Sequence, residues 1–476
     1  MKRKINYYMF LTCLFLLACT GCKKLVEVPE PVNSLTTAET FSTDANATSA
    51  IIAIYNDLTT GGFGTINYAN GYTTFLAGCS ADEFTYSSTN TNNLQFQNNN
   101  LQSNNAVVSG TFWTPAYFDV YMCNAAVEAL NASTGVTTAT KNQLLGEAKF
   151  LRAYVYFYLV NMFGNIPLTT TSAYTTNNLL KNSTPTQVYQ QIFADLKDAQ
   201  TLLANDYSYS KGERIRANKW AATALLARAY LYYASVSGDA TNFANAATQA
   251  SAVIANSSTY SLVSNLNNVF LKNSAETIWQ IVPNSNSNYA TWEGLQITNG
   301  QNSSYPTYDL TINLLNAFES NDRRKTAWTY SKTYLGVTYY GPYKYKVSSA
   351  TASNIPEYYM MLRLAEQYLI RAEAEAQQND LPDALSDLNT IRTRAGLPNL
   401  SAASTQPLVI AAVAQERRIE LFGEWGHRWF DLKRTGQAIS VLSAEKGFTL
   451  SNNALLWPIP YDATNKDPNL QQNPGY

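Results

Sequence analysis

The pattern that most constrains the fold of this chain is a series of helical segments with recognisable ends. Thr184-Pro185-Thr186-Gln187 is a capping box with proline at the first helical position, where a missing N–H costs nothing, and it predicts a helix over residues 185–203. Residues 217–233 alternate Ala with Leu, Tyr and Arg, and Gly238 separates them from a further helical pattern over 243–254. Because small residues allow close helix contact, 185–203 and 217–233 predict a helical hairpin.

A second hairpin is predicted from residues 359–377 and 382–394. Both hairpins resemble tetratricopeptide repeats in type, but the strict Trp, Gly, Tyr and Pro pattern of that repeat is absent, so we describe them as degenerate repeats. Helical periodicity also occurs over 47–58, 117–130 and 144–162. The sequence therefore predicts a mainly α fold: a tetratricopeptide-like helical hairpin scaffold with long loop-rich insertions and a few short strands.

Two long stretches lack helical periodicity. Residues 60–110 are a run of Gly, Asn, Ser, Thr and Tyr, and residues 258–350 form an irregular insertion. Within the insertion, short strands are predicted at 277–282 and 338–345, separated by a polar, Tyr-bearing tract at 284–308. Loops of this length in a compact protein are usually functional or disordered, and loops held on a rigid scaffold commonly carry binding sites.

The N-terminus has the features of a bacterial export signal. A basic start at 2–4, an apolar run at 9–18 that is too short to span a bilayer, and Thr20-Gly21-Cys22 predict a signal peptide over 1–21. The small residues before Cys22 resemble a lipobox, in which this cysteine is acylated and becomes the mature N-terminus, although Cys19 stands where Leu is usual. A plain secretory signal with a coincidental cysteine is the alternative.

The predicted organisation after the signal is a lipidated tether over 22–40, rich in Pro, Val and Thr, followed by one domain over 41–476. The domain consists of an N-terminal helical part at about 41–257, the loop-rich insertion at about 258–350, and C-terminal helices with a tail at about 351–476. When Cys22 is acylated, Cys79 and Cys123 are the only cysteines of the mature chain that keep a free thiol. An exported protein permits a disulfide between them, but sequence alone does not supply its geometry.

The composition restricts the classes of ligand that the protein can bind. Charged residues are only 14% of the 476 residues, against about 25% in average soluble domains, whereas aromatic residues reach 13% and include 33 Tyr. The formal net charge of −1 leaves no basic excess to neutralise phosphates, which excludes nucleic acid as a partner. A surface of Asn, Ser, Thr and Tyr suits neutral, hydroxyl-rich ligands better than polyanions.

The sequence contains no recognisable motif for catalysis or for binding a cofactor. His427 is the only histidine, so a multi-histidine metal site is excluded, and no Gly-rich phosphate loop or nucleophile elbow occurs. No Cys-x-x-Cys pair remains once the predicted signal peptide over 1–21 is removed. Arg363 with Glu366, and Arg371 with Glu375, have helical spacing for ion pairs within one helix or between neighbouring helices. A buried or half-buried ion network is also predicted in the C-terminal part, from Arg417, Arg418, Glu420, Arg428 and Asp431. We therefore predict a protein that is not an enzyme.

Five strings in order resemble the SusD/RagB family along almost the whole mature chain. They are AKFLRAY (148–154) leading to FGNIPL (163–168), LRLAE (362–366) with YLIRAEA (368–374), LNTIRTRAGL (388–397), ERRIEL (416–421) with RWFDLKR (428–434), and WPIP (457–460) with QNPGY (472–476). The resemblance implies a nutrient-binding lipoprotein of the outer membrane, a surface protein that is expected to capture glycan and deliver it to a SusC-like TonB-dependent transporter. It implies no cofactor, although Asp and Asn in the loops could hold a structural calcium.

In this family the helical framework is shared and the ligand site lies in variable loops, so candidate site residues are carried over by region only. A pyranose presents C–H groups to an aromatic face and hydroxyls to polar side chains. The candidates are Tyr68, Tyr72, Phe75, Tyr86, Asp82 and Glu83 in the first loop, and Asn288, Tyr289, Trp292 and Tyr305 in the second. Trp292 is the foremost candidate because no amphipathic helix surrounds it, whereas Trp113 begins a helix and is expected in the core. For each ring, packing against the scaffold is the alternative.

Two other functions remain open at this point. A peptide-binding member of the same family would keep the scaffold and partner but change the ligand. A glycoside hydrolase would require two carboxylates flanking one cleft.

Overall fold

The computed structural model describes residues 36–60, 67–296, 305–401 and 404–476, so the predicted signal peptide, Cys22 and most of the tether lie outside it. The described chain begins with the short helix α2 (Thr37–Thr40), inside the predicted tether. The long helices of the scaffold are α3 (Asp44–Thr60), α6 (Thr114–Ala132), α7 (Thr138–Phe163), α9 (Pro185–Leu202), α10 (Lys219–Ser237), α11 (Thr241–Ala255), α15 (Leu364–Gln377), α16 (Leu381–Ala395) and α17 (Gln406–Glu420).

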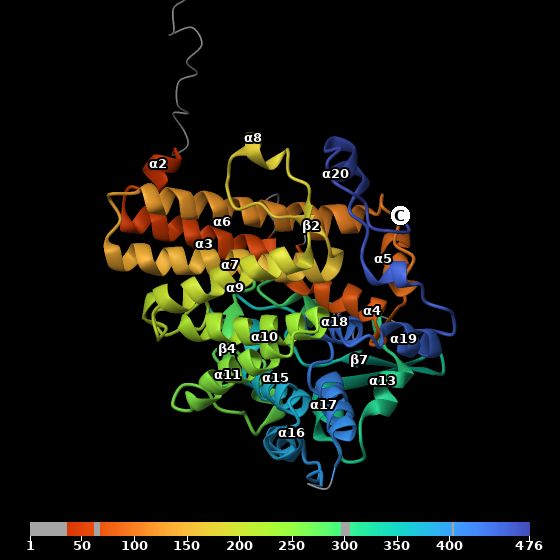
Figure 1. Cartoon of the computed structure of the whole chain (residues 1–476). Helices are drawn as coiled ribbons and strands as arrows, with labels where there is room; N and C mark the ends of the chain where they lie inside the picture. The colour runs from red at the N-terminus through yellow and green to blue at the C-terminus, as the bar shows by residue number, and fades with distance from the viewer. Residues whose placement is uncertain (1–35, 61–66, 297–304, 402–403) are drawn as a thin grey trace, which may run out of the picture.

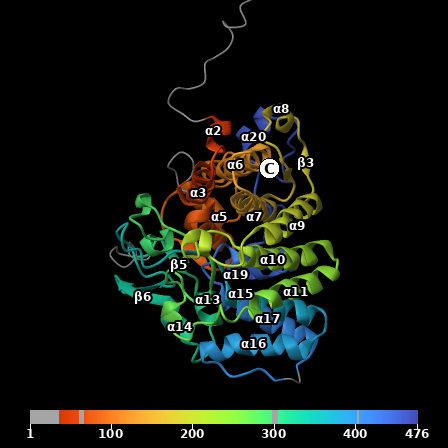
Figure 2. The ribbon, with the colours of Figure 1, turned by 90° about the vertical axis from the view of Figure 1, so that its left-hand side faces the viewer.

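These helices form a stack in which each packs mainly on its neighbours in the series. Contacts run from α6 to α7, α9, α10, α11, α15 and α16, as the layers in Figure 1 show from top to bottom. Figure 2 shows the strands β5 and β6 on the opposite side of the molecule from α9, α10 and α11. The predicted hairpins α9–α10 and α15–α16 are confirmed, and the fold is mainly α and tetratricopeptide-like.

The capping signals set the helix ends where the sequence predicts them. The Thr184 side chain accepts a hydrogen bond from the Gln187 N–H at 3.4 Å, and Pro185 is the first residue of α9. The Asn218 side chain accepts from the Ala221 N–H at 2.9 Å at the start of α10, and Gly238 ends that helix with a φ of 71°. A left-handed residue at this position favours glycine.

Most of the core is one large cluster of buried side chains that extends from Phe41 to Ile459, and α7 and α10 contribute to it around almost their whole circumference. On α10, buried alanines such as Ala222 and Ala229 let α9 and α11 approach from different sides. Trp113, which precedes α6, is buried as predicted and makes an edge contact with Phe163 at 4.9 Å between ring centroids. No helix in the described ranges combines the length and the apolar character that crossing a bilayer requires.

The prediction of a structureless stretch over 60–110 is wrong for the residues that the structure describes. They form short elements: a π-helix η2 (Tyr68–Ala77), α4 (Gly78–Ser80), β1 (Phe84–Tyr86), α5 (Thr91–Gln97) and a second π-helix η3 (Val108–Trp113). Elements this short show no clear period, and several of their polar residues are buried. Asn67, for example, is fully buried and donates to the Asp57 carbonyl at 2.9 Å. Side chains that hydrogen-bond the backbone let a polar sequence form interior structure.

The strands pair in four two-stranded sheets, all antiparallel, in the described part of the chain. The predicted strands are confirmed as β4 (Thr277–Ile281) and β7 (Val337–Pro342), with partners β8 (Tyr359–Arg363) and β6 (Thr329–Tyr334). The prediction of helix from residue 359 is wrong, because 359–363 form β8 and α15 begins at Leu364. A strand buried on both faces reads as a continuous apolar run, which cannot be told from a helix by periodicity.

The remaining elements are short. The other sheets are β1 with β5 (Tyr308–Leu310) and β2 (Ile166–Pro167) with β3 (Asn182–Ser183). Further helices are α8 (Tyr174–Asn177), α13 (Ile312–Ala317), α14 (Arg323–Trp328), α18 (His427–Arg434), α19 (Ala438–Lys446) and α20 (Tyr461–Lys466), with single 3₁₀ turns at Ser208–Ser210, Leu266–Asn268, Ser285–Ser287 and Asn452–Leu455.

The predicted C-terminal ion network is present and largely buried, but its partners differ from the local ones. Arg363 does not pair with Glu366; it pairs with Glu420 at 2.7 Å, and Glu366 pairs with Arg228 of α10 at 2.6 Å. Arg371 pairs with Glu375 at 3.7 Å, and more closely with Asp387 of α16 at 2.6 Å. These pairs tie neighbouring elements together.

Glu420 lies at the centre of a buried group that we call the Glu420 cluster, composed of Glu276, Arg324, Arg363, Arg394, Glu416 and Glu420. The Glu420 carboxylate accepts from Arg363 at 2.7 Å, from Arg324 at 3.0 Å, and from Arg394. Burial alone would raise the pKa of this carboxyl, but the three guanidinium groups together hold it well below its usual range. The cluster joins α14, β8, α16 and α17.

Cys79 and Cys123 are both buried free thiols, so the disulfide left open by the sequence is not formed. The single histidine, His427, is also buried, with its Nε2 3.9 Å from the Glu366 carboxylate.

Candidate functional site

Two segments far apart in the sequence meet at Gly71 and Trp292. Gly71 has a φ of 93°, and a Cβ atom added there would lie 2.9 Å from both the Cβ and Cδ1 atoms of Trp292. The left-handed backbone and the close approach both require glycine. Gly71 thereby brings η2 against the polar tract of the insertion.

Trp292 and Tyr72 form a half-buried ring pair at this junction. Their ring centroids are 5.7 Å apart with an interplanar angle of 33°. The backbone N–H of Trp292 donates to the Tyr359 hydroxyl at 2.9 Å, which attaches the tract to β8 in the core. Both residues therefore remain partly accessible on a fixed support.

Glu293, the residue after Trp292, joins this tract to η2. It is buried, and its Oε1 accepts a hydrogen bond from the Thr74 hydroxyl of η2 at 2.9 Å. Burial raises the pKa of the Glu293 carboxyl to about 7. Its Oε2 has no hydrogen-bond partner in the described chain. This carboxyl supports the junction and faces the interior.

Asn288 and Tyr289 lie in a tight turn just before Trp292. Both have left-handed backbones, with φ of 54° and 56°. The Asn288 carbonyl accepts from the Ala350 N–H at 2.9 Å, and the Tyr289 N–H donates to the Asn284 carbonyl at 2.9 Å. The Asn288 residue is exposed and Tyr289 is half-buried. The turn thus holds a free side-chain amide close in sequence to the ring pair.

Tyr305, which precedes β5, contacts a second group of rings, Tyr334 and Tyr339, on the β6–β7 hairpin. Tyr305 is 42% exposed. Its ring stacks on the Tyr339 ring with 5.6 Å between centroids, and its centroid lies 6.4 Å from that of Tyr334. Leu335 and Gly336 form the two-residue turn of the hairpin, with φ of 50° and 82°, as a type I′ turn requires.

Tyr334 and Tyr339 were not predicted from the sequence as site residues. The signal that could have found them is the Leu335-Gly336 turn between runs rich in Thr and Tyr, which is typical of a hairpin. We call Tyr72, Trp292, Tyr305, Tyr334 and Tyr339 the aromatic surface.

Tyr308 connects the two ring groups. It stacks on Phe75 of η2 at 4.3 Å between centroids and contacts Tyr86 at 5.3 Å. Phe75 follows Tyr72 by one helical turn, and Tyr308 follows Tyr305 at the start of β5. The structure therefore packs the segment that follows Tyr305 against η2, the element that bears Tyr72.

Five other candidates are buried and face protein rather than solvent. They are Tyr68, Phe75, Asp82, Glu83 and Tyr86. The Tyr68 hydroxyl donates to Asp119 at 2.8 Å, and the Asp82 carboxylate accepts from Arg428 and Arg418, each at 2.7 Å. The sequence placed these residues in an open loop because it did not reveal that this stretch folds into the core.

The pKa values of two buried carboxyls in the 60–110 stretch, Asp82 and Glu83, shift in opposite directions. Burial would raise the pKa of Asp82, but Arg428 and Arg418 hold it below its usual range. Burial and the neighbouring Asp82 charge raise the pKa of Glu83 to about 8. Asp82 is thus a partner in the C-terminal ion network and Glu83 is a buried neutral acid at neutral pH. No group of three or more His, Cys, Asp or Glu side chains in the described ranges is arranged to hold a metal ion.

Comparison with known proteins identifies the family. A sequence profile of the SusD family matches residues 167–476. The chain belongs to the SusD family. A second profile, described as starch-binding associating with outer membrane, matches residues 38–231 of this SusD-family chain. The two matches confirm the resemblance inferred from the five strings.

Similar SusD-family proteins span the chain. SusD-like protein P2 of Formosa agariphila is 27% identical, over 98% of this chain and 99% of the relative. Starch-binding protein SusD of Bacteroides thetaiotaomicron is 33% identical over 123 residues, which are 24% of this chain and 21% of the relative. The solved structure of a laminarin binding SusD-like protein has a TM-score of 0.75 at 24% identity, and the match covers 92% of this chain and 100% of that one. The likeness confirms the SusD fold.

Proposed function

We propose that this SusD-family protein binds glycan at the aromatic surface and catalyses nothing. The observation that carries the proposal is the partly exposed set of rings on a fixed support, in a chain with few charged residues. Tyr72 and Trp292 are half-buried, and Tyr305 stacks on Tyr339 while 42% of it remains exposed. Such rings match the C–H face of a sugar, because aromatic faces favour polarised C–H groups and exclude water.

Polar groups near the rings supply partners for sugar hydroxyls. Asn288 is exposed, and the Tyr289 ring is half-buried in the turn that leads to Trp292. Tyr68, Phe75, Asp82, Glu83 and Tyr86 would act beneath the surface as support, because their side chains are buried. The relatives described as starch-binding and laminarin binding support glycan as the ligand class.

The absence of catalysis in the proposal rests on where the carboxyls lie. A glycoside hydrolase needs two carboxylates flanking the scissile bond, about 5–10 Å apart. The carboxyls of Glu293, Asp82 and Glu83 are buried and bonded to protein groups. Asp309 of β5 is half-buried, and its carboxylate accepts from the Tyr340 N–H at 2.6 Å. They are placed for support and not for proton transfer to a bound glycan.

The proposal includes lipid attachment and a transporter partner. Acylation of Cys22 would leave 14 residues before Thr36, where the described chain begins, a reach of at most about 50 Å from the membrane. The family description that includes association with the outer membrane supports this location. On the cell surface, a SusC-like TonB-dependent transporter would receive the glycan.

The test is migration of the mature chain in gels that contain one polysaccharide each. Starch or laminarin is expected to retard the wild type, and Trp292→Ala and Tyr305→Ala are expected to reduce the retardation. Tyr174→Ala is the matched control, because Tyr174 is 76% exposed on α8, outside the aromatic surface. Retardation of all variants alike would contradict the placement of the site. No retardation by any polysaccharide, with binding of peptides instead, would replace glycan by peptide as the ligand.

A further inference from the structure

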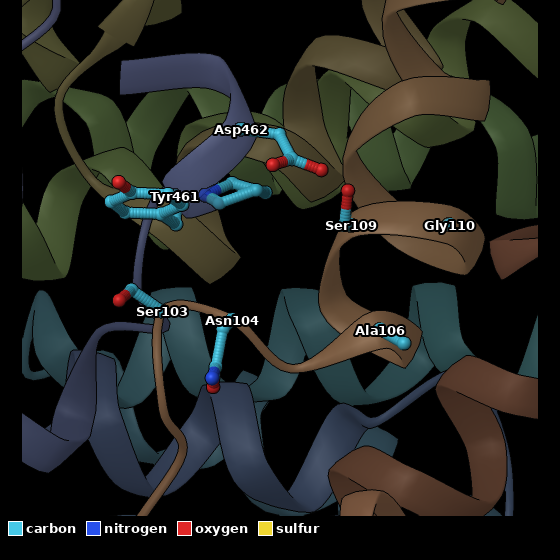
Figure 3. Close-up of a pocket in the computed structure, with 8 residues that line it drawn as sticks. Ser103, Asn104, Ala106, Ser109, Gly110, Tyr461 and Asp462 are labelled. Carbon is cyan, nitrogen blue, oxygen red and sulfur yellow. The ribbon is translucent and has the colours of Figure 1, made fainter. Parts of the chain in front are cut away.

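A separate cavity of about 270 Å³ lies between residues 103–110 and the start of α20. Figure 3 shows Tyr461 and Asp462 on one wall, Ser109 and Gly110 on a second, and Ser103 and Asn104 on a third. None of these residues belongs to the aromatic surface. The cavity is therefore separate from the aromatic surface.

The polar side chains around this cavity have no hydrogen-bond partner within the described part of the chain. Within the described chain, the side chains of Ser103, Asn104, Ser109, Tyr461 and Asp462 make no hydrogen bond or ion pair. They comprise two hydroxyls, a carboxamide, a phenol and a carboxylate. These groups are free to bind a ligand.

The walls of the cavity are fixed from behind. Asn105 is buried, and its Nδ2 donates to the Asn92 carbonyl at 3.0 Å and to Gln95 at 2.8 Å. Its Oδ1 accepts from the backbone N–H groups of Val107 and Val108 at 2.9 and 3.1 Å. These four bonds hold the 103–109 segment in one conformation.

A backbone bond joins the two walls. The Tyr461 N–H donates to the Ser103 carbonyl at 2.8 Å. Just before α20, Trp457 is buried and contacts Phe112 at 4.8 Å between ring centroids. A ligand would enter a preformed site, which reduces the entropic cost of binding.

We propose that this cavity binds one neutral sugar residue, as a second glycan subsite separate from the aromatic surface. The Tyr461 ring is 55% exposed and offers a face for C–H groups, while Asp462, Asn104 and the serines offer partners for hydroxyls. The volume lies just below the range of about 300–1,000 Å³ that suits larger ligands, so it fits a single residue. The one carboxylate disfavours anionic sugars.

The place of the cavity gives this subsite a role within the proposed function, on which it rests. Both views show α20 at the same end of the molecule as α2 and α8 (Figures 1 and 2). The described chain begins at that end, in α2, so this is the end from which the sequence leads back to Cys22. A sugar residue held there would lie at the same end of the molecule as α2.

Gly110 provides a selective way to close the cavity. A Cβ atom at Gly110 would meet nothing within 4 Å, so a larger side chain is accommodated without disturbing the fold and occupies the open space. Asp462→Asn keeps the shape and removes the charge. Tyr461→Ala removes the ring.

The experiment is saturation-transfer NMR on the mature chain in detergent, with maltose, laminaribiose, cellobiose and mannobiose as probes. In the Trp292→Ala/Tyr305→Ala background, one disaccharide is expected to retain transfer. Adding Tyr461→Ala is expected to weaken that binding roughly tenfold, and Gly110→Leu to abolish it. Tyr174→Ala is the matched control, and thermal unfolding verifies that each variant is folded. Asp462→Asn is expected to weaken binding without any change of shape.

The outcomes separate this inference from the proposed function. If the wild type binds a disaccharide and Trp292→Ala/Tyr305→Ala removes all transfer, the second subsite does not exist and the aromatic surface stands alone. If Gly110→Leu, Tyr461→Ala and Asp462→Asn leave the residual transfer unchanged, the inference is likewise overturned. Absence of binding by the wild type to every disaccharide and polysaccharide would overturn both proposals.

Discussion

The Glu420 cluster and the aromatic surface are two regions built from opposite kinds of side chain. In the cluster, charged groups are buried and bonded to one another, with Glu420 accepting from Arg324, Arg363 and Arg394. On the aromatic surface, neutral rings such as Trp292 and Tyr305 remain partly exposed. Although charged residues are scarce in this chain, several of those in the C-terminal part are buried in ion pairs inside the fold.

This contrast explains which parts of the sequence resemble the family most visibly. The strings at 362–366, 388–397 and 416–421 supply Arg363, Arg394, Glu416 and Glu420, which are four of the six members of the Glu420 cluster. A buried ion pair requires one geometry, because removing one partner leaves a charge without compensation. The aromatic surface needs only rings that reach solvent, which many sequences can supply.

The largest effect is expected from breaking the cluster at its centre. Glu420→Ala would leave three buried guanidinium groups without their shared carboxylate and is expected to lower the free energy of unfolding by at least about 3–5 kcal/mol. Since domains are stable by about 5–15 kcal/mol, much of the protein is expected to be unfolded. Urea denaturation followed by far-UV circular dichroism measures this loss.

Glu420→Gln distinguishes charge from packing at the same position. It keeps the volume but removes the negative charge, so it is expected to be almost as damaging as Glu420→Ala. A Gln variant with the stability of the wild type would show that packing, not charge compensation, holds the cluster together. It would also remove the basis of the contrast between the two regions.

The next largest effect on stability is expected at Phe75, and it distinguishes a ring that supports the aromatic surface from a ring that contacts the glycan. Phe75 is buried and stacks on Tyr308, so Phe75→Ala is expected to cost about 3–5 kcal/mol of stability. Trp292→Ala, at a half-buried ring, is expected to cost less stability but to reduce gel retardation. Denaturation and affinity gels on the same samples provide both measurements. A Phe75→Ala protein that is stable but no longer binds glycan would place this ring in the ligand site.

How much of this could be predicted from the sequence depends on the distance between partners. Helix ends were predicted because caps such as Thr184 and Gln187 lie three residues apart. The partner of Arg363 was missed because Glu420 lies 57 residues away, whereas Glu366 is the charge visible nearby. The same limit applied to the site: nothing local reveals that η2 is buried, or that Gly71 meets Trp292. Long-range contacts decide these features.

A third prediction uses Glu293, a buried carboxyl under the aromatic surface. Its pKa is about 7 in the folded protein against 4.5 for the ordinary group, so between these values the folded state keeps a proton that the unfolded state releases. Its contribution to stability therefore falls as the pH rises from about 4.5 to about 7, and then levels off.

Glu293→Gln removes this titration while keeping an oxygen for the Thr74 hydroxyl. The loss of stability between pH 5 and pH 8 is expected to be smaller in the variant than in the wild type, by roughly 3 kcal/mol. Denaturation curves at the two pH values measure the difference. Equal pH dependence in both proteins would mean that Glu293 is ionised in the folded state at neutral pH.

The smallest effect is expected at an ion pair outside both regions. Lys149 of α7 pairs with Asp198 of α9, but the Asp198 side chain is 54% exposed. Water already solvates such a pair, and ordering two side chains opposes its formation, so Asp198→Asn is expected to change the free energy of unfolding by only about 0–1 kcal/mol. The same denaturation assay measures it beside Glu420→Gln, which also removes one negative charge. A loss at Asp198 as large as that at Glu420 would mean that burial is not what makes the cluster matter, and the contrast between the two regions would fail.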